Sequence, residues 1–279
     1  MHIDVKQLVT DVSSLISLPE IYLKVRALID DPSSDLDDFS AVVNSDPGLA
    51  AVVLKIVNSA FFNFPGKIDN INRALNLIGI GQLHDLVLSL SALKALDFPN
   101  DIEPLKTFWQ RSIYSGTLAK LLAQKNKLHD PESLFVSGLL HEIGHILLFM
   151  KFPEQSKNIV HQADTNQQSL IEVENELLGT DFGKIGQALM EDWNLPYKLQ
   201  CITGAQSQPE AATEYQIETM IIHIAHKAAV NRFPGADSFQ YVLEQENLDS
   251  LNISEDDMTK LHGQALQLSN DIEKVILRR

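Results

Sequence analysis

The sequence contains a single cysteine, Cys201, among 279 residues. One thiol excludes both an intrachain disulfide framework and a zinc site built from several cysteines. No uncharged apolar run reaches the ~18 residues of a membrane-spanning helix, so we expect no such helix. The first residues carry an acid at Asp4 and lack the apolar stretch of a secretion signal. These absences predict a cytoplasmic protein.

Basic residues are also scarce. Lys and Arg number 22 against 37 Asp and Glu, which gives a formal net charge of −15. Such a charge repels phosphate backbones and anionic lipids over most of the surface, so we expect neither nucleic acid nor a membrane as a partner. The apolar fraction of 44% is typical of a globular protein. The length suits either one large domain or two modest ones.

Signals for β-strands are poor, because there is no Asn-Gly or Asp-Gly hairpin turn and no long alternation of β-branched residues. Apolar residues instead recur at helical spacing, as in Leu49, Val52, Val53, Ile56 and Val57. Further helices are predicted over 83–96, 131–150, 169–178, 183–193, 214–230 and 254–276. Asp46-Pro47 and Asp130-Pro131 have the form of helix N-termini, and Ser254 with Asp257 that of a capping box. The sequence predicts an all-α fold.

A boundary is predicted within residues 97–107. The stretch from Asp97 to Pro104 carries two prolines and several acids between two helical runs. We therefore predict two helical subdomains, 1–103 and 104–279. The helices at 47–58 and 83–96 belong to the first, and those at 131–150 and 214–230 to the second.

One motif by itself indicates a zinc peptidase. His141, Glu142 and His145 match the pattern H-E-x-x-H, which on a helix places both histidines on one face with a glutamate able to activate metal-bound water. A third ligand would be needed, and the candidates are Glu172, Glu174 and Glu176. The chain lacks the strands on which such peptidases align their substrates, so a chance match on an apolar helix is the simpler interpretation.

An ordered set of segments resembles the HDOD family, helical output domains related to the HD metal-dependent phosphohydrolases. The resemblance runs over about residues 13–232 in the order of the family. It rests on Ser17–Pro19, Asn44–Leu49, Leu54–Ala60, Ile71–Gly79, Phe108–Ser112, Ser137–Gly144, Glu176–Asp181 and Trp193–Pro196. It implies that the second predicted subdomain is HD-like and that the helix around His141 once carried metal ligands.

The resemblance also implies that much of the metal site has been lost. The first histidine ligand of the HD enzymes falls at Arg111, whose guanidinium cannot coordinate a cation. The His-Asp pair becomes His141 and Glu142, a carboxylate one methylene longer. A later histidine becomes Phe182, which has no donor atom.

Two further ligand positions are altered. The histidine pair expected after Trp193–Pro196 falls in Cys201–Ala205, which contains no histidine, and the closing aspartate falls at His226. The residual candidates for a metal, and for catalysis, are thus His141, Glu142 and His226. Imidazole and carboxylate ligands suit a divalent ion, and losing ligands lowers affinity. We expect no cofactor, or at most a weakly bound divalent metal.

We accordingly interpret the chain as a bacterial regulatory module in signal transduction. It is expected to act by binding a protein partner or a small nucleotide, and it is not expected to be an enzyme. The alternative is a metal-dependent phosphohydrolase acting on a nucleotide or phosphodiester, and the remote alternative is the zinc peptidase. Motifs for phosphate loops, dinucleotide folds and serine hydrolases are absent.

Overall fold

The computed structural model describes residues 2–13, 16, 18–95, 103–234 and 239–276, and over these residues it contains helices and no strand. The all-α prediction is therefore confirmed. Two predicted N-termini also form, since Asp46 Oδ1 accepts from Leu49 N–H at 3.0 Å and Asp130 Oδ1 from Ser133 N–H at 3.3 Å. The capping box forms as well, with Ser254 Oγ accepting from the N–H of Asp257 at 3.1 Å.

The chain divides into two compact units. The larger comprises residues 1–17 and 98–265, and the smaller comprises 18–97 and 266–279. Residues 1–17 thus group with the later helices, whereas the sequence placed them with the first subdomain. Ile3 N–H donates to Leu178 O at 3.0 Å, and Lys151 pairs with Asp11 at 2.8 Å. Residues 97–102 of the predicted junction lie outside the described residues, so the bounds 1–103 and 104–279 stay a prediction.

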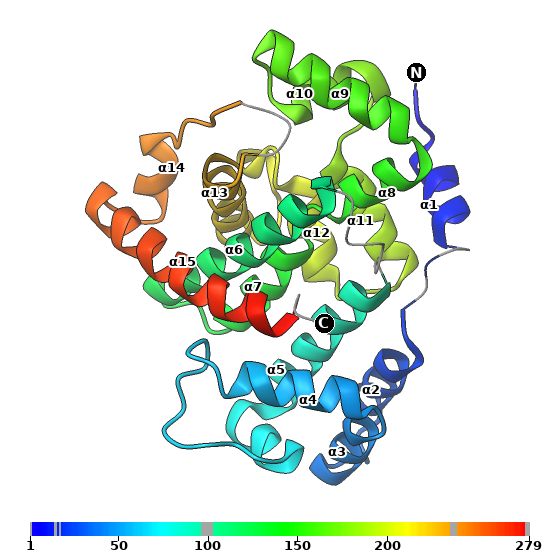
Figure 1. The fold of residues 1–279 in the computed structure, drawn as a ribbon, viewed down its shortest axis with the longest axis vertical. Helices are drawn as coiled ribbons and strands as arrows, with labels where there is room; N and C mark the ends of the chain where they lie inside the picture. Colours follow the sequence, from blue (N-terminus) through cyan, green and yellow to red (C-terminus); the bar gives the residue numbers. More distant parts are fainter. Residues whose placement is uncertain (1, 14–15, 17, 96–102, 235–238, 277–279) are drawn as a thin grey trace. The chain divides into compact units, whose positions relative to one another are not determined.

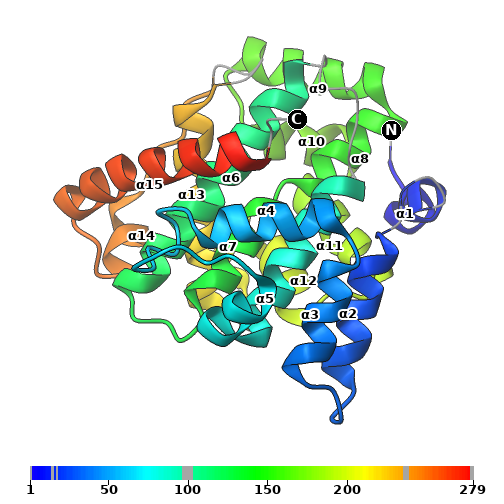
Figure 2. The ribbon, with the colours of Figure 1, turned by 60° about the horizontal axis from the view of Figure 1, so that its bottom comes forward.

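The smaller unit holds the first apolar helices. Its elements are α2 (Glu20–Asp30), α3 (Leu36–Asn44), α4 (Pro47–Val57) and α5 (Ile71–Ala95). Helices α2 and α3 lie side by side (Figure 2). Val25, Val43 and Val53 are fully buried and form part of its core. Helix α5 bends at Gly79, whose φ of 82° and ψ of 166° are not helical, so its first two turns form a separate short segment.

The larger unit contains the helices of the predicted HD-like part. They are α1 (Val5–Ser13), α6 (Glu103–Lys125), α7 (Pro131–Leu140), α8 (Ile143–Lys151), α9 (Pro153–Asn166), α10 (Leu170–Leu178), α11 (Phe182–Asp192), α12 (Tyr197–Ala205), the 3-10 turn Pro209–Ala211, α13 (Gln216–Arg232), α14 (Gln245–Ser250) and α15 (Glu255–Ile276), which ends in the smaller unit. Helix α6 packs against both α7 and α13 (Figure 1).

Two glycines allow α6 and α7 to touch backbone to backbone. A Cβ added to Gly138 would lie 2.6 Å from both N and Cα of Gly116, and one added to Gly116 would lie 2.6 Å from Phe135 O. Gly144 makes a similar contact, because its Cβ would overlap Phe182 O of α11. Glycine inside a helix costs about 1 kcal/mol relative to alanine, and these contacts explain why it is used here.

Two described segments are long and apolar enough to cross a membrane, judged by length and composition alone. They are Ile71–Ala92 and Pro131–Lys151, with mean hydropathies of 1.2 and 1.5. The search for uncharged runs did not find these two segments, because each contains charged residues, as Ile71–Ala92 contains Arg73 and Pro131–Lys151 contains Glu142. A third span would arise if α3 and α4, bent by 115°, counted as one. The apolar window of Pro131–Lys151 is 83% buried within the protein, where it supplies the core.

The glycine crossing gives a first prediction. Gly138→Ala should lower the free energy of unfolding by about 1–3 kcal/mol, because the added methyl group must separate two helix backbones. Gly263→Ala is the matched control, since Gly263 is an exposed helical glycine of α15 with nothing within 4 Å of its added Cβ. It should raise stability by roughly 0.5–1 kcal/mol. Urea denaturation of both variants measures the difference, and equal shifts would contradict the packing argument.

Candidate functional site

The segment that carries His141 and Glu142 is a break between two helices. The sequence predicted one helix over 131–150, but α7 ends at Leu140 and α8 starts at Ile143. Glu142 has φ −97° and ψ 12°, which is outside the helical region. The prediction was wrong because apolar residues continue without interruption across the turn. Both side chains turn into the protein, with His141 0% and Glu142 1% exposed.

The three residues predicted as residual metal ligands come together at this break. His226, on α13, is 5% exposed, and its Nδ1 lies 3.0 Å from His141 Nε2 and 3.2 Å from Glu142 Oε1. One ligand atom from each residue lies within 4.8 Å of the others. The turn, α7 and α13 belong to the larger unit, so the site is built within one unit.

The protons on the two histidines follow from their partners. His141 Nδ1 lies 2.6 Å from the carbonyl of Gly138, which can only accept, so Nδ1 carries a proton. Burial lowers the pKa of His141 to about 4 although the Glu142 carboxylate acts to raise it, so the ring is neutral and its Nε2 accepts. His226 Nδ1 faces this acceptor and therefore donates. The two candidate ligands His141 and His226 are thus joined to each other by a hydrogen bond.

His145, the second histidine of the H-E-x-x-H pattern, points to a different partner. Its Nε2 lies 3.0 Å from Glu174 Oε1, and the other oxygen of Glu174 accepts from Phe182 N–H at 2.8 Å. Burial by itself would lower the pKa of His145, but the Glu174 carboxylate raises it above its ordinary value. The ligand atoms that gather in the described residues belong to His141, Glu142 and His226 and exclude His145.

The peptidase hypothesis fails on this arrangement. One of the three candidate glutamates, Glu174, does reach His145, but it does not bring His145 to His141. Glu172 is occupied at the N-terminus of α10, where it accepts from Ser169 N–H at 2.9 Å, and Glu176 contacts Gln168. Without a helix between residues 141 and 145, the two histidines do not share one face.

Arg111 and Phe182 occupy positions where the HDOD resemblance places lost ligands. Arg111 is 7% exposed, and its Nε–H donates to Phe233 O at 2.8 Å. Phe182 is 1% exposed, and its ring centroid lies 4.1 Å from that of His145 and 5.5 Å from that of His226. A fixed cation and an aromatic ring thus border the three candidate ligands.

The negative charge of Glu142 is balanced by neighbouring side chains of the protein. Burial by itself would raise the pKa of Glu142, but His226, His141 and Arg111 together bring it below its ordinary value. The carboxylate is therefore ionised at neutral pH. Arg111 stays charged under all ordinary conditions, so it supplies a permanent positive charge.

This arrangement does not fit a tightly held metal. To ligate through Nδ1, His226 would have to move its proton to Nε2, which is buried and has no hydrogen-bond partner among the described residues. An unsatisfied buried donor costs about 1–3 kcal/mol, and ligating histidines normally donate that second N–H to an acceptor. A divalent ion would also meet the charge of Arg111.

Residues that the motifs did not reveal complete the site. Gln206 donates from Nε2 to His141 O at 2.7 Å and to Thr203 O at 3.0 Å, and its own carbonyl accepts from His223 Nδ1 at 2.7 Å. Tyr241 covers His226, with ring centroids 5.7 Å apart. Neither Gln206 nor Tyr241 belongs to a recognisable sequence motif, so only the folded structure shows that they lie at the site.

The geometry defines a class: a helical protein with a buried cluster of two histidines and a carboxylate. The HDOD domain model matches residues 15–209, about two thirds of the chain. The protein belongs to the HDOD family.

Similar proteins agree with this fold. An uncharacterized protein of Treponema pallidum (strain Nichols) is 26% identical over 263 residues, which are 92% of this chain and 50% of that protein. The chain thus spans about half the length of that relative. An HDOD domain protein of unknown function from Geobacter sulfurreducens superposes with a TM-score of 0.78 at 19% identity, covering 98% of both chains.

Two further solved structures share the fold at low identity. A proposed phosphohydrolase from Shewanella amazonensis SB2B has a TM-score of 0.68 at 23% identity, covering 97% of this chain and 92% of that one. A proposed signal transduction protein from Marinobacter aquaeolei VT8 has a TM-score of 0.73 at 22% identity, covering 95% of this chain and 60% of that one.

The closed cluster gives a prediction about metal content. The protein purified without added metal should carry far less than one equivalent of iron, zinc, manganese or nickel, because His226 donates where a ligand would have to accept and Arg111 supplies the charge. Elemental analysis by mass spectrometry measures this. A stoichiometric metal that His141→Ala removes would contradict the prediction, and His129→Ala, at an exposed position, is the control.

The buried histidines predict a loss of stability in acid. Burial lowers the pKa of His141 and of His223 to about 4, below the ordinary value of 6.5. Between pH 6.5 and 4 the unfolded chain therefore binds protons that the folded chain does not, and stability falls as the pH falls. The loss from His141 alone approaches roughly 3 kcal/mol. Urea denaturation across this range should show the decline, with a shallower slope in His223→Gln. An unchanged slope in that variant would contradict the assignment for His223.

Proposed function

We propose that the protein is a non-catalytic regulatory module that works in the cytoplasm by binding a partner in a signalling pathway. The observation that carries the proposal is that the fixed positive charge of Arg111 acts on the buried carboxylate of Glu142. A charge that a metal would supply in a hydrolase is supplied here by a side chain, and a guanidinium cannot activate water as a metal does. The cluster then acts as a polar core that fixes the turn between α7 and α8.

The partner is a protein or a small nucleotide. The formal charge of −15 argues against extended nucleic acid, since its phosphates would be repelled over most of the surface. It argues equally against an anionic membrane surface. The description of the Marinobacter relative as a signal transduction protein supports the same direction.

The competing hypothesis is a metal-dependent phosphohydrolase. It is favoured by the gathering of His141, Glu142 and His226 within 4.8 Å and by the description of the Shewanella relative. It requires His226 to change its protonated nitrogen and the ion to tolerate Arg111. An activity measurement separates the two hypotheses.

We expect no hydrolysis of bis-p-nitrophenyl phosphate or of nucleotides above background, with or without added Mn²⁺ or Mg²⁺. His141→Ala should leave that rate at background and lower the free energy of unfolding by about 1–3 kcal/mol, because His226 and Gly138 lose a buried partner. Glu142→Gln should be milder, since the amide keeps the size and hydrogen-bonding capacity of the side chain. Metal-dependent turnover in the wild type that His141→Ala abolishes at unchanged melting temperature would establish the phosphohydrolase instead.

A further inference from the structure

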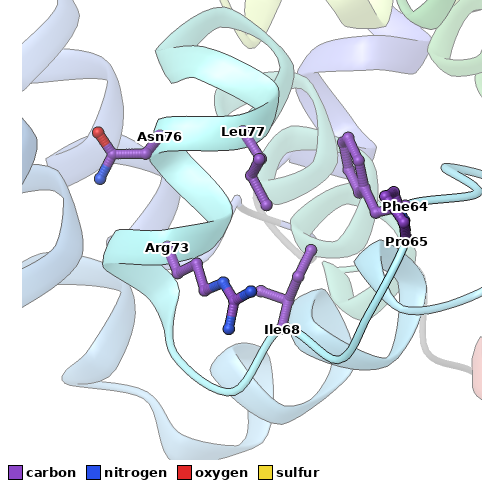
Figure 3. Close-up of a pocket in the computed structure, with 6 residues that line it drawn as sticks. All are labelled: Phe64, Pro65, Ile68, Arg73, Asn76 and Leu77. Carbon is purple, nitrogen blue, oxygen red and sulfur yellow. The ribbon is translucent and has the colours of Figure 1, made fainter.

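The smaller unit contains a groove that the buried cluster does not use. It has a volume of about 380 Å³ and is lined by Phe64, Pro65, Ile68, Arg73, Asn76 and Leu77. Figure 3 shows Leu77 and Ile68 pointing toward each other, with Arg73 on one side and Phe64 with Pro65 on the other. The lining is mostly apolar and includes one charged side chain.

The loop wall of the groove is held in one shape. Asn58 donates from Nδ2 to Ile68 O at 2.7 Å, and Asn58 Oδ1 accepts from Ile68 N–H at 2.8 Å, so one side chain fixes both backbone groups of Ile68. The Phe64 ring stacks on Phe62 with centroids 5.9 Å apart and an interplanar angle of 11°. A preformed wall lowers the entropy that a ligand must overcome on binding.

The helical wall is the first part of α5, before its bend at Gly79. Arg73, Asn76 and Leu77 follow the i, i+3, i+4 spacing and so share one face of this segment. Leu77 is 47% exposed, so about half of its apolar side chain can contact a ligand. The helix therefore presents an apolar side chain and a cation to whatever enters the groove.

Arg73 lacks an acidic partner within the part of the chain that the structure describes. Among the described residues no carboxylate lies within 4.0 Å of its guanidinium, although the sequence holds 37 acids against 22 bases. Two other cations of the same unit do have such partners, since Lys24 pairs with Glu20 at 2.8 Å and Lys94 with Asp46 at 3.3 Å, whereas Lys55 and Lys67 resemble Arg73 in having none among the described residues. A guanidinium binds carboxylates in a planar fork, and beside an apolar wall such a pair is strengthened.

We propose that this groove binds a segment of a partner protein in which a large apolar side chain stands next to an acidic one. The apolar side chain would lie between Leu77, Ile68 and Phe64, and the carboxylate would pair with Arg73. The volume lies at the small end of ligand pockets, which run from about 300 to 1,000 Å³, and suits one or two side chains. The inference rests on the proposed partner-binding function, and it specifies which side chains the partner would present to the groove.

Four fluorescein-labelled peptides with identical Gly-Ser flanks test the proposal by fluorescence polarisation on the full chain. Their central sequences are Leu-Phe-Asp-Glu, Leu-Phe-Asn-Gln, Leu-Phe-Lys-Arg and Ser-Asn-Asp-Glu. The wild type should bind the first about tenfold more tightly than the second, as a charge-assisted pair predicts, and should bind the last two weakest. Leu77→Asp should weaken binding of the first peptide at least tenfold.

Charge reversal is the sharper arm of this experiment. Arg73→Glu should lose the preference for Leu-Phe-Asp-Glu and gain one for Leu-Phe-Lys-Arg, a change that general unfolding cannot produce. Matched controls on α2 are Lys24→Glu and Leu23→Asp, both at exposed positions outside the groove, and neither should alter the ranking.

Three outcomes overturn the proposal. The first is that no peptide binds, and the second is that the ranking is unchanged in Arg73→Glu. The third is that phenyl phosphate binds while every peptide fails, which would assign the groove to a small anionic ligand. All three results leave the hydrolysis assay unaffected, so a failure of the groove and a failure of the non-catalytic function are distinguishable.

Discussion

A carboxylate buried in an apolar core is the constraint on which the larger unit depends. Glu142 is ionised although it is almost fully removed from water, and an isolated charge there would cost several kcal/mol. The chain meets this cost with groups from separate helices: His226 on α13, and Arg111 on α6, which is itself held by Phe233 O. The positions of α6, the turn at residue 141 and α13 are therefore coupled by one electrostatic requirement.

The glycine contacts make this arrangement possible. The α6–α7 crossing at Gly116 and Gly138 brings Arg111 and the turn within electrostatic range, and Gly144 lets α11 bring Phe182 against the same turn. A larger side chain at any of these points would separate the helices and leave Glu142 with fewer partners. Close packing and charge balance thus constrain the same short stretch of sequence.

The sequence predicted those parts of the molecule that are locally determined. The caps at Asp46, Asp130 and Ser254 depend on neighbours a few residues away, and they formed as predicted. The helical periods also did so, except over 131–150. The resemblance to the HDOD family located His141, Glu142 and His226 before any geometry was known. It could do so because the segments carrying the resemblance occur in the order of the family.

What the sequence did not predict depends on contacts between distant segments. The break at His141 lies in a stretch that is buried on all sides. Apolar residues continue through the turn, so the hydrophobic pattern of the sequence does not mark where the helix ends. The pairing of His145 with Glu174 needs α8 and α10 to meet. The grouping of residues 1–17 with the later helices follows from the backbone hydrogen bond to Leu178, whereas an amphipathic pattern tells only which face of α1 is apolar.

Two asparagines, Asn58 and Asn231, each bond both the N–H and the carbonyl of a residue ten positions further along, Ile68 and Tyr241. Each side chain imitates a neighbouring β-strand and so closes a loop at its base. The position of the residue that ends the loop is then set by the asparagine and depends little on the intervening residues. Insertions and deletions between positions 58 and 68 should accordingly be tolerated during evolution without moving Ile68, so loop length can diverge among relatives while the floor of the groove stays in place.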